Sequence, residues 1–168
     1  MNVLIVDGYN IIGDWEELKC LKEESLSHAR DRLVEILAEY QAYYGIKVIV
    51  VFDAHFVKGP KSTATAFRIE IIYTKENETA DERIERLVTK HKNVENAVYV
   101  ATSDHLEQRI IFGRGALRKS ARELSIEVEE MTKNIKDKIQ TKNKETRDLK
   151  ISLNDELKHA FEKWRRRK

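Results

Sequence analysis

The chain has 168 residues, of which 36% are charged and 41% hydrophobic, proportions typical of a globular protein with a highly charged surface. Its net charge of +2 is close to neutral, so any attraction for a polyanion must come from how the charges are arranged. A lone cysteine, Cys20, excludes an internal disulfide and a cysteine-based zinc finger, and no apolar stretch approaches the length of a membrane span. We therefore expect a cytoplasmic protein without a membrane partner.

Strand and helix patterns alternate along the chain. Continuous apolar runs at 3–6, at 48–52 and within 96–104 predict buried strands, and alternation over 67–74 predicts a strand near an edge. Helical spacing predicts helices over 26–44, with Gly45 as a C-cap, and over 78–91. The remaining expectations are a loop over 56–66, helical stretches near 104–112 and 115–124, and a short strand over 125–131. Continuous strands separated by helices imply an α/β domain with a mainly parallel central sheet flanked by helices.

The composition changes near residue 130. From Thr132 onward the chain is rich in lysine and polar residues, as an appended helix or a loosely ordered arm would be. We predict one domain over 1–130 and a basic helical C-terminal extension over 131–168. Apolar residues recur at helical spacing near the end, which indicates that at least this part docks. They are Leu153, Leu157, Phe161 and Trp164.

An aspartate follows each of the three buried strands: Asp7, Asp53 and Asp104. Because the carboxyl ends of parallel strands meet at one edge of the sheet, we expect these carboxylates to lie in the same region. Each one alone could be a turn residue. Together they would repel one another unless a cation joined them, and oxygen ligands without a Cys or His cluster favour Mg²⁺ or Mn²⁺.

Asp81 has two interpretations. Thr79 and Glu82 have the spacing of a capping box, so Asp81 could simply lie in the first turn of a helix and favour its positive end. A helix that begins at the same edge of the sheet would also direct Asp81 toward the other acids. The two roles are compatible.

Four motifs in order resemble the NYN domain family of PIN-like, metal-dependent ribonucleases, and most closely its YacP-type bacterial branch. They are "DGYN" at 7–10, "FDAH" at 52–55, "YTKENETADERIE" at 73–85 and "ATSDH" at 101–105, and "RGALRKSAREL" at 114–124 is also similar. The resemblance covers residues 2 to about 130. It implies a PIN-like three-layer sandwich and an endoribonuclease that cuts messenger RNA, in some members on the ribosome.

The resemblance also implies roles for single residues. Asp7, Asp81 and Asp104 match the catalytic, metal-binding acids, while Asn10 matches the asparagine after the first acid and Asp53 the acid after the second strand. Glu82 and Ser103 are further supporting candidates. The chemistry agrees, because phosphodiester hydrolysis needs an activated water and stabilised phosphate charge, and divalent ions held by carboxylates can supply both.

An acidic pocket repels RNA, so an RNA enzyme needs basic residues around its rim. Each basic run alone is most often a solvated face, but several runs flank the predicted acidic site. The RNA-binding candidates are Lys58, Lys61, Arg68, Arg109, Arg114, Arg118, Lys119, Arg122, Arg165, Arg166 and Arg167.

Two other functions are possible on sequence grounds. The chain could be a non-catalytic RNA- or ribosome-binding module, although the intact acids argue against it. It could also be a phosphohydrolase with an aspartyl nucleophile, but such enzymes usually carry a second aspartate two residues later, where this chain has Tyr9. No glycine-rich phosphate loop or dinucleotide motif is present, so no nucleotide cofactor is expected.

Overall fold

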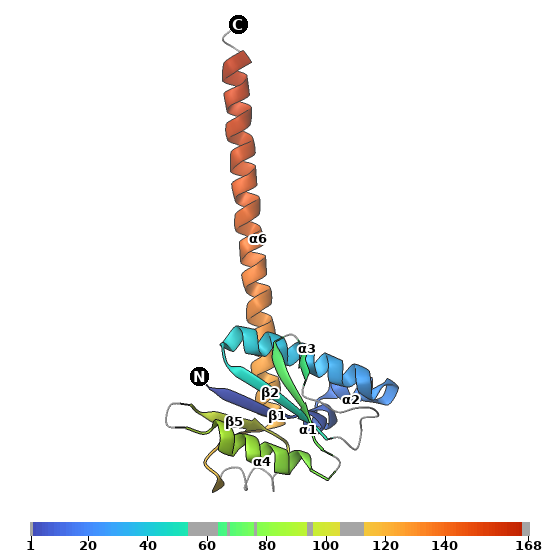
Figure 1. Ribbon diagram of the computed structural model, residues 1–168. Coiled ribbons are helices and arrows are strands. Elements are labelled where there is room, and N and C mark those ends of the chain that lie inside the picture. Colours follow the sequence, from blue (N-terminus) through green and yellow to red (C-terminus); the bar gives the residue numbers. More distant parts are fainter. Residues whose placement is uncertain are drawn as a thin grey trace. The chain divides into compact units, whose positions relative to one another are not determined.

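The computed structural model describes residues 2–53, 64–66, 68–75, 77–93, 96–104 and 113–165. The chain divides into two compact units, Met1–Val128 and Glu129–Lys168. The first unit holds the whole sheet, and the second is helical throughout its described residues (Figure 1). Over the described residues, no helix combines the length and the apolar character that a membrane crossing requires.

The first unit is built on a six-stranded sheet with the order β3-β4-β2-β1-β5-β6. Five of its strands are parallel, and β3 pairs with β4 in the antiparallel direction at one edge. In chain order the strands are Val3–Asp7, Lys47–Phe52, Ala64–Ala66, Ile69–Tyr73, Val98–Ala101 and Leu117–Lys119, which are β1 to β6. The prediction of an α/β fold with a mainly parallel central sheet is confirmed, including the place of β4 next to the edge strand.

Helices cover both faces of the sheet, with α3 and α4 on opposite sides (Figure 1). The described helices are α1 Gly8–Asp14, α2 Glu16–Glu24, α3 Leu26–Tyr44, α4 Ala80–His91 and α6 Ala121–Arg165. The predictions for α3 and α4 are confirmed, and Gly45 ends α3 in the left-handed conformation with φ of 63°. The short helices α1 and α2 were not predicted, because they bury few apolar side chains and therefore show little periodicity.

Alternation along β1 decides which helix each of its side chains meets. Val3 and Ile5 pack in one core cluster with Ile84 and Val88 of α4. Since successive side chains of a strand point to opposite faces, Asp7 has the same parity as these two and belongs to the α4 side. The carboxyl ends of the parallel strands form one side of the sheet, which we call the carboxyl edge. Asp7 lies there, and so does the first turn of α4, because this helix follows the end of β4.

The passage from β1 into α1 is abrupt. Asp7 ends the strand and is also the N-cap of the helix, since its carboxylate accepts a hydrogen bond from the Asn10 backbone N–H at 3.2 Å. A Cβ at Gly8 would lie 2.2 Å from the ring of Phe52, so glycine is required at that position. This close approach fixes Asp7 at the end of a buried strand.

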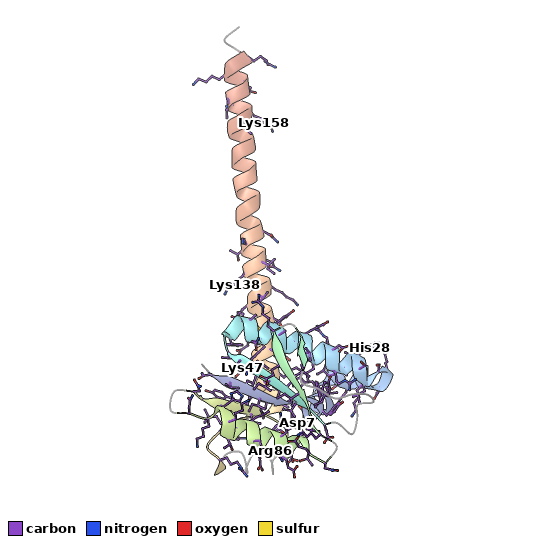
Figure 2. The ribbon with its side chains drawn as sticks, in the orientation of Figure 1. Asp7, His28, Lys47, Arg86, Lys138 and Lys158 are labelled. Carbon is purple, nitrogen blue, oxygen red and sulfur yellow. The ribbon has the colours of Figure 1, made fainter. Side chains whose placement is uncertain are left out.

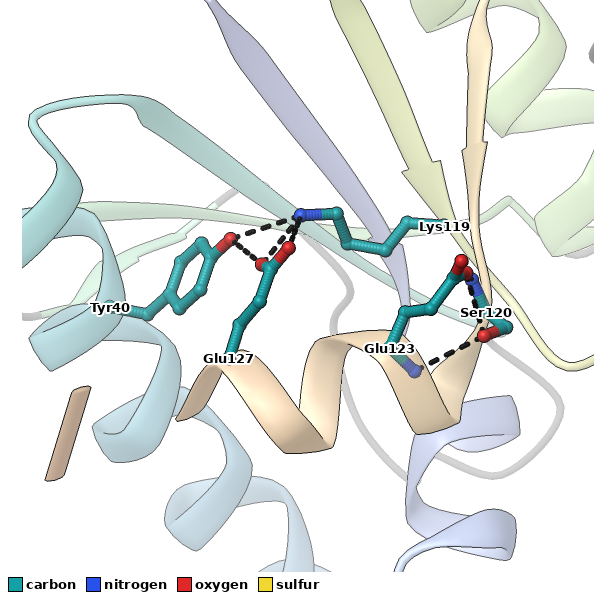
Figure 3. Close-up of polar contacts among 5 residues, drawn as sticks. All are labelled: Tyr40, Lys119, Ser120, Glu123 and Glu127. Atoms are coloured by element: carbon teal, nitrogen blue, oxygen red, sulfur yellow. Dashed lines mark hydrogen bonds and ion pairs between the residues drawn. The ribbon is translucent and has the colours of Figure 1, made fainter. Parts of the chain in front are cut away.

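Of the predicted elements near the end of the first unit, the strand over 125–131 is wrong and the helix over 115–124 is right only for residues 121–124. Residues 117–119 form β6, within the stretch predicted as a helix over 115–124, because they pair with β5 at the sheet edge. Residues 125–131 are helical, not a strand, because α6 begins at Ala121 and continues through them. Ser120 and Glu123 form reciprocal hydrogen bonds at this start, a capping-box pattern in the sequence that could have located it (Figure 3).

The second unit is the continuation of α6, a helix of 45 residues that reaches Arg165. Of the two structures considered for this segment, an appended helix and a loosely ordered arm, the first is observed. Leu157 is exposed, and the side chains of the other three residues whose spacing predicted docking lie outside the described part. The docking and the domain boundary at residue 130 stay predictions.

Candidate acidic site at the carboxyl edge of the sheet

The structure brings the predicted acids from four elements to one edge of the sheet. Asp7 is the last residue of β1 and is 8% exposed, whereas Asp53 directly follows β2. Asp104 lies three residues after β5, and Asp81 lies in the first turn of α4. Figure 2 shows Asp7 at the end of the sheet away from Lys47, the first residue of β2.

The charges of these acids act on one another. The pKa of Asp7 is raised from 3.8 to about 6, chiefly because burial removes water from its carboxylate. The charges of Asp81, Asp53 and Asp104 raise this pKa further, while the hydrogen bond from Asn10 opposes the change. The pKa of Asp81 is also raised, first by loss of water and then by the charge of Asp104. Ionisation of Asp7 and Asp81 at this edge is therefore less favourable than ionisation of an aspartate in water.

The donor chemistry of this edge fits a hard divalent cation. Carboxylate oxygens are the ligands that Mg²⁺ and Mn²⁺ prefer, and a cation would favour the ionised form of Asp7, whose pKa is raised by burial and by the neighbouring acids. No three of the described His, Cys, Asp and Glu side chains, however, are gathered closely enough to enclose an ion as they stand. Asp81 and Asp104 are exposed, so their side chains are not closely packed and would have to turn toward an ion for it to be bound.

Asn10 connects α1 to the segment after β5. Its side-chain oxygen accepts hydrogen bonds from the backbone N–H of Ser103 at 2.6 Å and from the Ser103 hydroxyl. Since a backbone N–H can only donate, the Asn10 atom facing Ser103 is the oxygen, and the Asn10 amide NH₂ points elsewhere as a donor. The supporting positions Asn10 and Ser103 thus form one unit. Whether they contribute to activity stays a prediction.

Thr102 was not singled out in the sequence, although it shapes the same segment. Its side chain is fully buried and its hydroxyl accepts a hydrogen bond from the backbone N–H of Asp104 at 3.1 Å. A threonine two residues before an acid at the end of a strand is a known turn pattern, and it could have been recognised. This contact fixes the backbone that carries Asp104.

The capping box predicted at the start of α4 is confirmed. The Thr79 hydroxyl accepts from the Glu82 N–H at 3.2 Å, and the Glu82 carboxylate accepts from the Thr79 N–H at 3.3 Å. Asp81 makes neither contact, and its pKa is raised by burial and then by the charge of Asp104. Both interpretations of Asp81 therefore stand, as a first-turn acid near the positive end of the helix and as a member of the acidic edge.

Glu78 was also missed, and no pattern in the sequence indicates it. Its carboxylate is 5% exposed and binds Arg86 at 2.8 Å and the backbone N–H of Lys75 at 3.3 Å. These contacts hold the segment between β4 and α4. They therefore position the turn that carries Asp81.

The predicted RNA-binding residues fall into several environments. Arg68, Arg118, Arg122 and Arg165 are exposed. Arg114 is exposed but pairs with Glu85 at 2.6 Å, and the Lys119 ammonium binds Glu127 at 2.6 Å, so their charges are offset within the chain. Lys58, Lys61, Arg109, Arg166 and Arg167 lie outside the described residues. RNA binding by all of these residues stays a prediction.

Comparison with known proteins identifies the relatives of this chain. The YacP-like NYN domain matches residues 4–166, well beyond the last motif noted in the sequence. The protein YacP of Bacillus subtilis (strain 168) is 54% identical over 166 residues, which are 99% of this chain and 98% of that protein.

Solved structures agree with this relationship. The crystal structure of Rae1 (YacP) from Bacillus subtilis matches with a TM-score of 0.78 and 54% identity, over 99% of this chain and 95% of that one. Its W164L mutant matches with a TM-score of 0.76 and 53% identity, over 84% and 83% of the two chains. With its fold and its sequence both shared at this level, the chain belongs to the YacP-like NYN domain family.

Proposed function

We propose that this protein is a divalent-metal-dependent endoribonuclease that hydrolyses phosphodiester bonds of RNA. The observation that carries the proposal is the convergence of Asp7, Asp81 and Asp104 from separate elements on one edge, where burial and then the neighbouring acids raise the pKa of Asp7 and of Asp81. Gathering carboxylates in this way does not stabilise a fold, because the carboxylates repel one another. Membership of the NYN family supports a nuclease.

In this proposal Asp7, Asp81 and Asp104 hold Mg²⁺ or Mn²⁺. The bound ion would supply a water that is nucleophilic near neutral pH and would stabilise the charge that develops on the phosphate. Asp7 is the central residue, because it ends a buried strand and is fixed by its contact with Asn10. Asp53 lies beside it and adds negative charge.

Asn10 has a separate part in the proposal. Its side-chain oxygen is bound to Ser103, its backbone N–H binds Asp7, and its amide NH₂ remains as a neutral donor. A neutral donor can bind a phosphate oxygen or orient a water without adding to the charge of the site. Asn10 is thus the residue that positions the substrate or the attacking water.

The substrate that we propose is messenger RNA, cut in the context of the ribosome in the cytoplasm. This context rests on the resemblance to ribosome-associated members of the YacP-type branch. The exposed basic residues of α6 and the first unit are the surface that would contact the RNA backbone.

Incubation of purified protein with RNA, free and as a ribosome-bound message, in Mg²⁺, Mn²⁺ or EDTA tests the proposal. Cleavage should occur with a divalent ion and stop with EDTA. Asp7→Asn and Asp104→Asn should remove cleavage, by a factor of about 10³ or more, while circular dichroism shows a folded protein. Wild-type rates in either variant would remove these acids from the catalytic site.

A further inference from the structure

Three aromatic residues lie along the carboxyl edge, on the side of the sheet that faces α3. Phe52 ends β2 and Tyr73 ends β4, and their rings are stacked with centroids 5.7 Å apart. The ring of Tyr9, two residues after Asp7, lies 5.1 Å from that of Phe52. Phe52 is fully buried, whereas Tyr9 and Tyr73 are partly exposed. The acids and this aromatic row therefore share one edge.

Arg30 reaches this edge from α3. Its guanidinium Nη1 donates a hydrogen bond to the Tyr9 hydroxyl at 3.0 Å, and the side chain is partly buried. The pKa of the Tyr9 hydroxyl is raised, chiefly by burial. The hydrogen bond from Arg30 lowers this pKa, whereas the charge of the nearby Asp53 carboxylate raises it. The sequence did not indicate Arg30, because an arginine within an amphipathic helix has no distinguishing pattern.

The environment of Arg30 differs from that of its neighbour Arg32 on the same helix. Arg32 binds the carboxylates of Glu17 at 2.7 Å and Glu35 at 3.6 Å. Arg30 contacts a neutral hydroxyl, and among the described residues no carboxylate lies within ion-pair distance of it. A guanidinium has five N–H donors, so several remain for another acceptor. A partly buried guanidinium that pairs with no carboxylate of the described residues is suited to bind an anionic group of a ligand.

We propose that Arg30, held in place by Tyr9, binds a backbone phosphate of the RNA strand beside the acidic site. This inference rests on the proposed function and extends it to a specific substrate contact. A polyanion approaching four carboxylates needs a fixed positive charge nearby, and a guanidinium matches the geometry of a phosphate with two parallel hydrogen bonds. Tyr9 is a positioning residue, because its ring rests on Phe52 and its hydroxyl orients the guanidinium.

Binding of a fluorescein-labelled single-stranded RNA to the full chain, measured by anisotropy in EDTA over a series of salt concentrations, tests the contact without cleavage. Arg30→Gln should weaken binding roughly 10- to 100-fold and reduce the slope of log affinity against log salt by about 0.7. Arg30→Lys should keep the slope and lose part of the affinity. Arg32→Gln removes the same charge from the same helix and should change binding little.

Tyr9→Phe tests the positioning role. It should weaken binding less than Arg30→Gln does and leave the salt slope unchanged, since no charge is lost. Added to Arg30→Gln, it should have little further effect, because the two residues would act as one unit. In cleavage assays with Mn²⁺, Arg30→Gln should raise KM with kcat little changed.

Equal losses in Arg30→Gln and Arg32→Gln would overturn the assignment, because they would reflect net charge alone. RNA binding that depends on Arg30 in a protein that does not cleave would support the binding of a phosphate by Arg30 and overturn only the proposed hydrolysis. A wild-type protein that neither binds nor cleaves RNA would overturn both.

Discussion

Two clusters of ionisable residues in the first unit differ in how their charge is balanced. At the acidic edge, four acids lie in one region, and burial raises the pKa of Asp7 to about 6, with a further contribution from the charges of the other three. In the second cluster, Lys119 of β6 binds the Glu127 carboxylate at 2.6 Å, and the Tyr40 hydroxyl of α3 contacts both groups (Figure 3). The Lys119 ammonium also lies over the rings of Tyr40 and Tyr99.

We interpret this difference as one between a cluster that stabilises the fold and a cluster that is placed to bind a ligand. Lys119 and Glu127 offset each other, and Tyr40, whose pKa is raised by burial and by Glu127, stays neutral between them. This cluster connects β6 and the start of α6 to α3, and its opposite charges are balanced within the protein. The acidic edge, by contrast, would become more favourable if a cation joined it, as we propose. Four predictions test this contrast, beginning with the largest expected effect.

Replacing Asp7 should stabilise the metal-free protein. A carboxyl whose pKa is higher in the folded state than in the unfolded state contributes stability below pH 4 that is lost as the pH rises through about 6. Asp7→Asn removes this loss and keeps an oxygen to cap α1, so the variant should be about 2–3 kcal/mol more stable at pH 7.5 in EDTA. The gain should shrink toward zero near pH 4 in urea unfolding curves.

Asp14→Asn is the matched control, since Asp14 ends α1 and is exposed. It should change stability little at either pH. An Asp7→Asn protein that is less stable than wild type at pH 7.5 would show that the carboxylate is satisfied as it stands.

Mn²⁺ should stabilise the wild-type protein, and Asp81→Asn should lose most of that effect. A ligand that binds only the folded state stabilises it by about 2.7 kcal/mol at one hundred times its Kd. If Asp81 only favoured the helix dipole, the substitution would cost roughly 0.3–1 kcal/mol with or without metal. Thermal melts with and without Mn²⁺ distinguish the two roles.

Glu82→Gln is the control for Asp81, because glutamine can still complete the capping box with Thr79. It should keep most of the thermal shift produced by Mn²⁺. A full metal shift in Asp81→Asn would leave Asp81 as a helix residue and nothing more.

Breaking the second cluster should destabilise the protein irrespective of metal. Glu127→Gln leaves the Lys119 ammonium, which is 15% exposed on its side chain, without its carboxylate. The expected cost is about 1–2 kcal/mol, reduced by the partial exposure of Glu127. Glu35→Gln removes an exposed partner of Arg32 and should cost less than about 0.5 kcal/mol. A Glu127→Gln effect that Mn²⁺ reverses would contradict the separation of the two clusters.

The smallest expected change in stability comes from the basic terminus. Replacing Arg165, Arg166 and Arg167 together by glutamine should leave the melting temperature and the Mn²⁺ shift unchanged. It should weaken binding to RNA or ribosomes and make the salt dependence shallower, by about 0.7 for each phosphate that the terminus no longer neutralises. An unchanged slope would mean that the terminus is only a solvated end.

Much of the fold could be predicted because it depends on local patterns. The apolar runs of β1, β2 and β5 are long enough to mark buried strands, and α3 and α4 repeat their apolar residues at helical spacing. The capping box at Thr79 and the glycine at position 45 are equally local signals. The aspartates at the ends of parallel strands were expected to lie in the same region, and the charges of Asp53 and Asp104 do act on Asp7 there, because parallel strands place their carboxyl ends at one edge.

Interactions between distant parts of the chain decided the rest. Residues 117–119 become a strand because they pair with β5, which is separated from them in the sequence and reaches them only in the folded chain. The helix over 125–131 is different, because its start at Ser120 and Glu123 is a local signal that was overlooked. The pairing of Asn10 with Ser103 and of Tyr9 with Arg30 joins residues 93 and 21 positions apart. Residue type and spacing thus determined which acids converge, whereas only the packed structure decided which neutral and basic groups stand beside them, since those side chains are selected by proximity in space and carry no periodic signal.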